Sequence, residues 1–165
     1  MEELSKRTLQ IEESPRFQER EWQATRVTWI LLLLVMLATG LGFFGNGPLS
    51  AARAGQSDGP LWVEYARFGR YGATVRLTVH ARSQADGVVR VTVGRSLLEA
   101  FRIEQITPQP GAGRFTEDGV EYRIDAGRQG HTPIIFELQP VRRWLVQGAI
   151  QSAGQTVHFT QFIYP

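Results

Sequence analysis

The sequence predicts an all-β domain, an immunoglobulin-like β-sandwich of about seven to eight antiparallel strands, preceded by one transmembrane α-helix. Two observations indicate this fold class. A long uncharged run stands near the N-terminus, and beyond it apolar and polar residues alternate over short segments that are separated by turn residues. A chain of 165 residues has room for one ordinary domain and an anchor, and hardly for two domains.

The uncharged run covers residues 27–44 (VTWILLLLVMLATGLGFF) and predicts the transmembrane helix. A helix of this length is about 27 Å long, close to the roughly 30 Å of hydrocarbon in a bilayer. It is apolar on every face, and the remaining residues are too few to bury such a helix inside a protein core. Ser14 and Pro15 predict that the helix begins near Pro15, and the glycines and proline of residues 45–48 predict its end.

The charges that flank the span predict its orientation. Five cations lie in residues 1–26, whereas the twenty residues after the span carry only Arg53. The positive-inside rule therefore places the N-terminus in the cytoplasm. The alternative is a cleaved signal peptide with a site near Ala52-Arg53-Ala54, but the long acidic N-terminal region and the long apolar core favour an uncleaved anchor.

These features divide the chain into four segments. We expect a cytoplasmic tail and helix start (1–26), the transmembrane helix (27–44), a linker (45–60) and a periplasmic β-domain (61–165), in a protein of the bacterial inner membrane. Ala38 and Gly42 have the spacing of small residues at which two membrane helices pack closely, and so they are a candidate contact for a homodimer. Glycines tolerated near a helix end explain the same pattern.

Period-two alternation predicts the strands of the domain. In residues 73–81 it places Val75, Leu77 and Val79 inward, and Asp86-Gly87 then supplies a hairpin turn into a second strand at 88–93. One helical turn is expected at 96–100. The Cys–Trp–Cys signature of true immunoglobulin domains is missing, so a small barrel remains an alternative. The other expected strands are 61–68, 101–107, 120–125, 133–138, 144–152 and 155–164.

The residue types needed for catalysis or metal binding do not occur in recognisable patterns. Cysteine is absent, and His80, His131 and His158 lack the spacing of a metal site, with His80 and His158 expected to face solvent. Ser96 and Ser152 stand outside any nucleophile-elbow motif. A formal net charge of +2 without a basic stripe gives no indication of a nucleic-acid partner. We therefore expect no enzymatic activity, no metal and no cofactor.

Aromatic residues and arginines cluster at the start of the domain and form a candidate protein interface. Both residue types are enriched at the centres of protein interfaces. In a strand of alternating pattern, however, half of the cluster would be core. The last strand, 155–164, would accept a strand from a partner if it lies at a sheet edge, and would be simply core if it is paired on both sides. The candidate interface residues are Trp62, Tyr65, Arg67, Phe68, Arg70 and Tyr71.

Several stretches of the chain are similar to a family of uncharacterised bacterial single-pass envelope proteins. They are FQEREW at 17–22, the membrane helix, GPLS at 47–50, LWVEYARF at 61–68 and FTQFIYP at 159–165. Relatives of that family accompany YetF-like integral membrane proteins, so the resemblance implies an accessory role. It assigns no functional residues.

Topology and composition together predict a membrane-anchored, non-enzymatic protein whose domain binds another membrane or periplasmic protein. The alternative is a sensor or binding module for a small molecule or glycan, with the loop at 127–133 as part of its site. A hydrolase with a dispersed active site is the third hypothesis.

Overall fold

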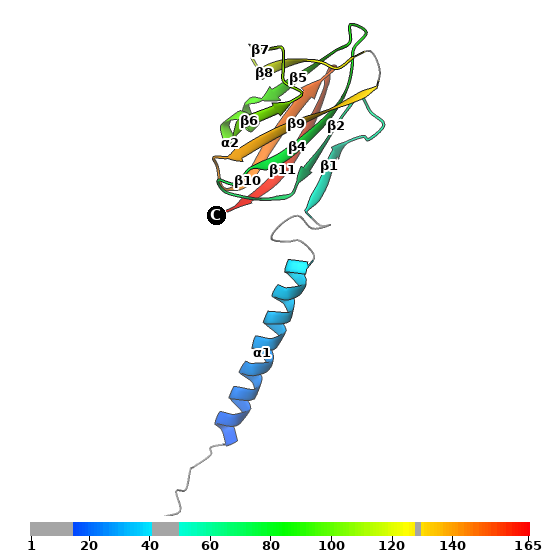
Figure 1. Cartoon of the computed structure of the whole chain (residues 1–165). Coiled ribbons are helices and arrows are strands. Elements are labelled where there is room, and N and C mark those ends of the chain that lie inside the picture. Colours follow the sequence, from blue (N-terminus) through cyan, green and yellow to red (C-terminus); the bar gives the residue numbers. More distant parts are fainter. Residues whose placement is uncertain (1–14, 41–49, 128–129) are drawn as a thin grey trace, which may run out of the picture. The chain divides into compact units, whose positions relative to one another are not determined.

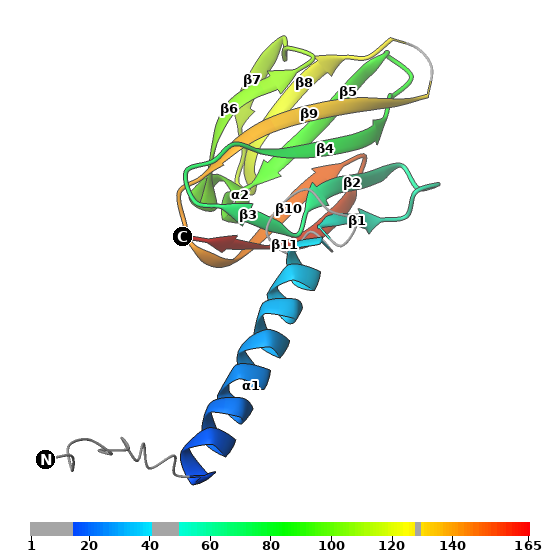
Figure 2. The same ribbon diagram turned by 60° about the horizontal axis from the view of Figure 1, so that its bottom comes forward.

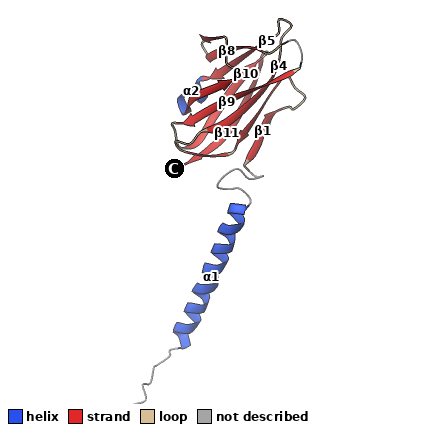
Figure 3. Ribbon diagram, in the orientation of Figure 1, coloured by secondary structure: helices blue, strands red, loops and turns tan. Residues whose placement is uncertain are grey.

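A computed structural model describes residues 15–40, 50–127 and 130–165 of the chain (Figure 1). The chain divides into two compact units, Met1–Ala38 and Thr39–Pro165, and each is described here by itself. The first contains most of helix α1, and the second contains a domain built mainly from strands (Figure 3).

Helix α1 runs from Pro15 to Gly40 and begins at the proline that the sequence indicated. From Trp22 onward its large apolar side chains are exposed; Leu33, for example, is 61 % exposed. The stretch Trp22–Gly40 is long and apolar enough to cross a membrane. Of the expected span, residues 27–40 belong to α1, and residues 41–44 lie outside the described part of the chain.

The domain consists of two sheets and the short helix α2 (Arg95–Ala100). The first sheet has the order β1-β2-β4-β9-β6, and the second has the order β3-β11-β10-β5-β8-β7. The strands of the first sheet are β1 (Ala51–Gly55), β2 (Leu61–Ala66), β4 (Val75–Arg82), β9 (His131–Pro140) and β6 (Phe101–Thr107). Those of the second are β3 (Phe68–Arg70), β11 (Gln155–Tyr164), β10 (Trp144–Ser152), β5 (Val88–Gly94), β8 (Gly119–Asp125) and β7 (Ala112–Phe115).

One hydrophobic core lies between the two sheets. The predicted inward residues Val75, Leu77 and Val79 are all buried, and Phe136 is the largest side chain that is fully buried. The second sheet contributes every other residue of its central strands, as in Val89, Val91 and Val93 of β5. Period-two alternation thus turns apolar side chains inward from both layers, because successive side chains of a strand point to opposite faces.

The predicted hairpin at Asp86-Gly87 is confirmed. Gly87 has a φ of 77°, a conformation that glycine adopts without strain. The Val88 N–H donates to the Asp86 carboxylate at 3.0 Å, and Arg90 donates to the same side chain at 2.7 Å. These two contacts, with the Val88 N–H the larger, lower the pKa of Asp86. The expected helical turn is also present, as α2.

The strand count and the strand directions differ from the prediction. The described residues contain eleven strands rather than seven to eight, and β1 occupies part of the expected linker, 45–60. The expected strand 61–68 divides at Arg67, where the chain passes from the first sheet to the second. Strand β3 then pairs parallel to β11, so the sheets are not wholly antiparallel. Three-residue strands such as β3 are too short to show a period in the sequence.

One end of the sandwich, here called the basal end, is where β1 begins. Register pairs Ala51 with Ala66 at the end of β2. Phe68 of β3 follows after Arg67 and pairs with Phe162. Strand β10 also starts at this end, because Trp144 pairs with Ile163. Figure 2 shows β3, the end of β11 and the connection from β9 to β10 together there.

Candidate interaction surfaces

The six residues of the candidate interface do not form one surface. Trp62 lies on the outer face of the first sheet, where its ring stacks on that of His80 with 3.6 Å between centroids. Tyr65 lies on the opposite face of β2 and packs against the core residue Phe159, with ring centroids 4.9 Å apart. The alternation of β2 therefore separates these two aromatic residues.

The other four, Arg67, Phe68, Arg70 and Tyr71, lie at the basal end. Arg67 links the sheets through its backbone: its N–H donates to the Ser50 carbonyl at 2.6 Å, and its carbonyl accepts from the Phe162 N–H at 2.8 Å. This crossover places the chain that follows beside β11. The structure thus brings these four residues together and separates them from the Trp62 ring.

A charged cluster surrounds the Trp62–His80 stack. Arg53 donates to Glu64 at 2.9 Å, and the second oxygen of that carboxylate lies 3.6 Å from Nε2 of His80. Burial lowers the pKa of His80, and it outweighs the opposite effect of Glu64. The expectation of a solvent-facing His80 is therefore wrong, since its side chain is only 18 % exposed. His158, in contrast, is exposed as expected.

His131 has a structural role at the start of β9. Its Nε2 lies 2.8 Å from the Gly59 carbonyl oxygen, which ties β9 to the turn between β1 and β2. The neighbouring residues 128–129, part of the loop considered for ligand binding, lie outside the described part of the chain. Within the part that is described, no group of three histidine or acidic side chains is placed to hold a metal ion.

The open edge of β11 is the first surface that stands out. Strand β10 pairs with β11 along its length, but β3 pairs with it only at residues 162–164. On the side away from β10, no described strand covers residues 155–161. Phe162 directs its N–H to this side, and backbone groups repeat their direction every second residue, so Thr156, His158 and Thr160 direct theirs the same way.

The edge formed by β6 is protected, whereas that of β11 is not. Strand β6 carries Arg102 and Glu104, both exposed, and its pairing with β9 shifts between Ile103 and Gln105. Charges and bulges of this kind discourage the addition of another strand. Residues 155–161 (QTVHFTQ) contain no lysine, arginine, carboxylate or proline. The sequence analysis left the position of this strand open, and pairing in three dimensions places it at an edge over most of its length.

The second surface is an exposed apolar patch at the basal end. Among the described residues of the domain, five large apolar side chains are exposed, and four of them lie at this end. Sequence reasoning missed this patch, although an apolar pair beside two arginines at a strand boundary (RRWL, 142–145) was a visible signal. We define the basal patch as Tyr71, Val141, Arg142, Arg143, Trp144 and Leu145.

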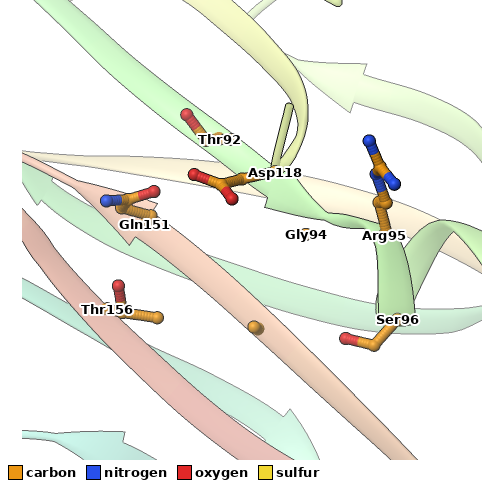
Figure 4. Close-up of a pocket in the computed structure, with 8 residues that line it drawn as sticks. Thr92, Gly94, Arg95, Ser96, Asp118, Gln151 and Thr156 are labelled. Carbon is orange, nitrogen blue, oxygen red and sulfur yellow. The ribbon is translucent and has the colours of Figure 1, made fainter. Parts of the chain in front are cut away.

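A hollow of about 330 Å³ lies on the second sheet beside the start of α2 (Figure 4). It forms around Gly94, where a side chain would come within 3.0 Å of the Ala149 carbonyl oxygen. Ser96 and Asp118 line it, but no histidine does, so the arrangement offers no imidazole base for a serine nucleophile. Its walls are small and polar rather than aromatic.

The predicted helix-packing pair is described in part. Ala38 lies in α1 and is partly buried, whereas Gly42 lies outside the described residues.

Comparison with known proteins gives no assignment. No model of a protein family matches the chain, and no curated protein matches it.

Proposed function

We propose that this chain is a membrane-anchored, non-enzymatic envelope protein whose β-domain binds another protein and serves as an accessory subunit of a second membrane protein. The open edge of β11 is the observation that carries this proposal. A partner contributes an extended segment, and that segment pairs with residues 155–161 as an added strand.

Backbone geometry supports this mode of binding. Thr156, His158 and Thr160 direct their N–H and carbonyl groups to the open side. Phe162 shows how such a group pairs, because its N–H donates to the Arg67 carbonyl of the covering chain. Backbone hydrogen bonds along such an edge supply affinity, and the alternate side chains supply specificity. The side chains of Thr156, His158 and Thr160 are exposed beside the edge, where they would contact a partner's side chains.

The class of partner follows from the anchor and from the resemblance. A domain joined to a membrane helix meets other membrane proteins far more often than soluble ones. The similarity to envelope proteins that accompany YetF-like membrane proteins favours a partner of that kind. The flanking cations favour a cytoplasmic N-terminus and a periplasmic domain in the bacterial inner membrane.

Site-specific photo-crosslinking in the native membrane tests the proposal without disturbing the fold. A photoreactive residue at His158 is expected to give a crosslinked product with a second protein. The matched control is the same residue at Gln105, which is exposed on the protected edge of β6 and should give none. If His158 gives no product, the proposal fails. A product with the mass of two copies of this chain would replace the accessory role with a homodimer.

Proline substitution tests the backbone contribution. His158→Pro removes an N–H that points to the open side, so the domain should fold while the partner is lost in a pull-down from mild detergent. His158→Ala removes the same side chain but keeps the N–H, and it should retain the partner. Equal recovery of the partner by both variants would contradict strand addition.

A reporter fusion tests the orientation. Alkaline phosphatase fused after Pro165 is expected to be active, because the enzyme folds only after export, whereas a green fluorescent protein at the same place should be dark. An inactive phosphatase and a fluorescent green fluorescent protein would place the domain in the cytoplasm and contradict the periplasmic assignment.

We further propose that the sandwich is of immunoglobulin-like type. The neighbours β2-β4-β9-β6 and β11-β10-β5-β8 correspond to the strand orders A-B-E-D and G-F-C-C′ of such domains. The chain order departs from the variable type, because β6 precedes β8 in the sequence. A solved structure of the domain that gave a different strand order would refute the assignment.

A further inference from the structure

We propose that the basal patch is a lipid-binding surface that docks the domain onto anionic phospholipid headgroups. The inference depends on the membrane anchor of the proposed function but not on its partner protein. Its starting point is the uneven distribution of exposed apolar side chains over the sandwich.

The patch combines apolar rings with cations. Trp144 is 61 % exposed and Leu145 is 67 % exposed, and Trp144 lies next to Phe162 with 6.0 Å between ring centroids. The guanidinium of Arg143 lies 4.4 Å from the centre of the Tyr71 ring. Tryptophan, tyrosine and arginine are the residues that bilayer interfaces accommodate best, because each has an apolar body and a polar tip.

The backbone of Trp144 is in a strained conformation that holds its side chain outward. Its φ is 72°, a left-handed conformation that a bulky residue rarely adopts. Strain of this kind persists where the surrounding structure enforces it, and it is concentrated at functional sites. At this first position of β10, a tryptophan ring is thus presented to solvent by a conformation that glycine would adopt more easily.

Charge also favours a negatively charged surface. The arginines of the basal end are Arg67, Arg70, Arg142 and Arg143. Glu99 offsets Arg142 through an ion pair of 3.4 Å, in which both side chains are exposed to solvent. The pair Arg76–Glu137 is neutral as a whole. The end is therefore net positive, which complements the phosphates of anionic lipids.

The chain that follows the membrane helix enters the domain at the basal end. Gly40 ends the described part of the membrane helix, and Ala51 begins β1 at the basal end. A chain segment of this length spans at most about 40 Å. The hydrophobic span and the basal patch are thus joined by a short tether, which raises the local concentration of lipid at the patch.

Fluorescent labelling of the full chain in vesicles tests the proposal. The native sequence contains no cysteine, so Leu145→Cys and Phe115→Cys each provide a single labelling site. Phe115 is 87 % exposed and lies in β7, away from the basal patch, which makes it the matched control. In vesicles that contain phosphatidylglycerol, spin-labelled headgroups should quench a label at 145 but not at 115. Resistance to alkaline extraction shows separately whether the helix is inserted.

Two variants identify the contributions of charge and of the ring. Each arginine near an anionic surface strengthens binding about fivefold, so Arg142→Gln with Arg143→Gln should lower the docked-to-free ratio about 25-fold. Trp144→Gly relieves the backbone strain and should weaken quenching without lowering the stability of the domain. If quenching at residue 145 were the same in both variants as in the native sequence, the proposal would be overturned.

The remaining outcomes are also decisive. Equal and weak quenching at 145 and 115 in inserted protein overturns lipid docking and leaves the anchor intact. Failure of the helix to insert overturns both. A label at 145 that is shielded in native membranes but unquenched in pure lipid vesicles assigns the patch to a protein partner instead, and this also overturns the inference.

Discussion

Helix α1 and the β-sandwich use the same apolar residue types in opposite ways. In α1 leucine and valine cover every face, and Leu33 and Val35 remain exposed. In the sandwich valine and leucine occupy every second position, and Val79 and Val91 are fully buried. The difference lies in the pattern, since both segments are rich in the same side chains.

This contrast bears on the solvent that suits each unit. A strand in which apolar and polar residues alternate buries its apolar face against a second sheet and leaves its polar residues in water. A helix that is apolar all round finds no such partner in a domain of this size, and lipid is the solvent that suits it. Four substitutions test or sharpen the contrast, in order of decreasing effect.

The largest effect is expected in the core of the sandwich. Phe136→Ala leaves a cavity at the largest fully buried side chain and should lower the free energy of unfolding by about 3–5 kcal/mol. Urea denaturation of the full chain in a mild detergent measures it. Phe115→Ala is the control, because that ring is exposed, and it should change stability by less than about 0.5 kcal/mol. Similar losses in both variants would contradict the two-sheet core.

A charge in the membrane helix is expected to have the next largest effect. Leu33→Arg places a cation in the middle of the apolar stretch and should disfavour insertion by about 3 kcal/mol, whereas Leu33→Ala should be tolerated. The fraction resistant to alkaline extraction reports insertion. If the arginine variant remained in the membrane fraction as fully as the alanine variant, Trp22–Gly40 would not be the span.

Gly148 of β10 tests how tightly the core packs between β10, β11 and α2. A methyl group at this position would lie 2.5 Å from Cζ of Phe159 and 2.8 Å from Cδ1 of Leu97, so Gly148→Ala should cost about 1–3 kcal/mol. At Gly111 a methyl group would meet only the Arg123 carbonyl oxygen, at 4.0 Å, an ordinary contact. Gly111→Ala is therefore the control that should leave the unfolding midpoint almost unchanged. Equal stability of the two variants would indicate a loose core.

The smallest effect is a pH dependence that arises from His80. Burial lowers the pKa of this imidazole, so protonation favours the unfolded state. Stability is therefore complete above the ordinary histidine pKa of about 6.5 and declines as the pH falls below it. His80→Phe keeps an aromatic ring on Trp62 but cannot titrate, so its stability should be flatter between about pH 7 and pH 5. A slope that persists in this variant would assign the effect to other groups.

Much of the fold was predictable because its signals are local. Asp86-Gly87 marks a hairpin through the conformations these residues favour, and the alternation of residues 73–81 depends only on the geometry of a strand. Strands β1 and β3 were not predictable in this way. They are short, and they form by pairing, β1 with β2 and β3 with β11, on either side of Arg67, which hydrogen-bonds to Ser50 and to Phe162.

The candidate surfaces were predictable only in part, because they too depend on contacts between residues that are distant in the sequence. Composition singled out the cluster from Trp62 to Tyr71. The alternation of β2 divided its first part between the outer face and the core, and the crossover at Arg67 placed the rest at the basal end. The basal patch joins Tyr71 to Arg143, which are distant in the chain, and no pattern in the sequence links them.

The sequence by itself determined that one segment suits lipid and that the remainder forms strands with a buried face, because both properties follow from the spacing of apolar residues along the chain. The tertiary structure alone decided which strand has an open edge and which side chains meet at the basal end. Those features depend on contacts between residues far apart in sequence, and such contacts form only when the two sheets pack together.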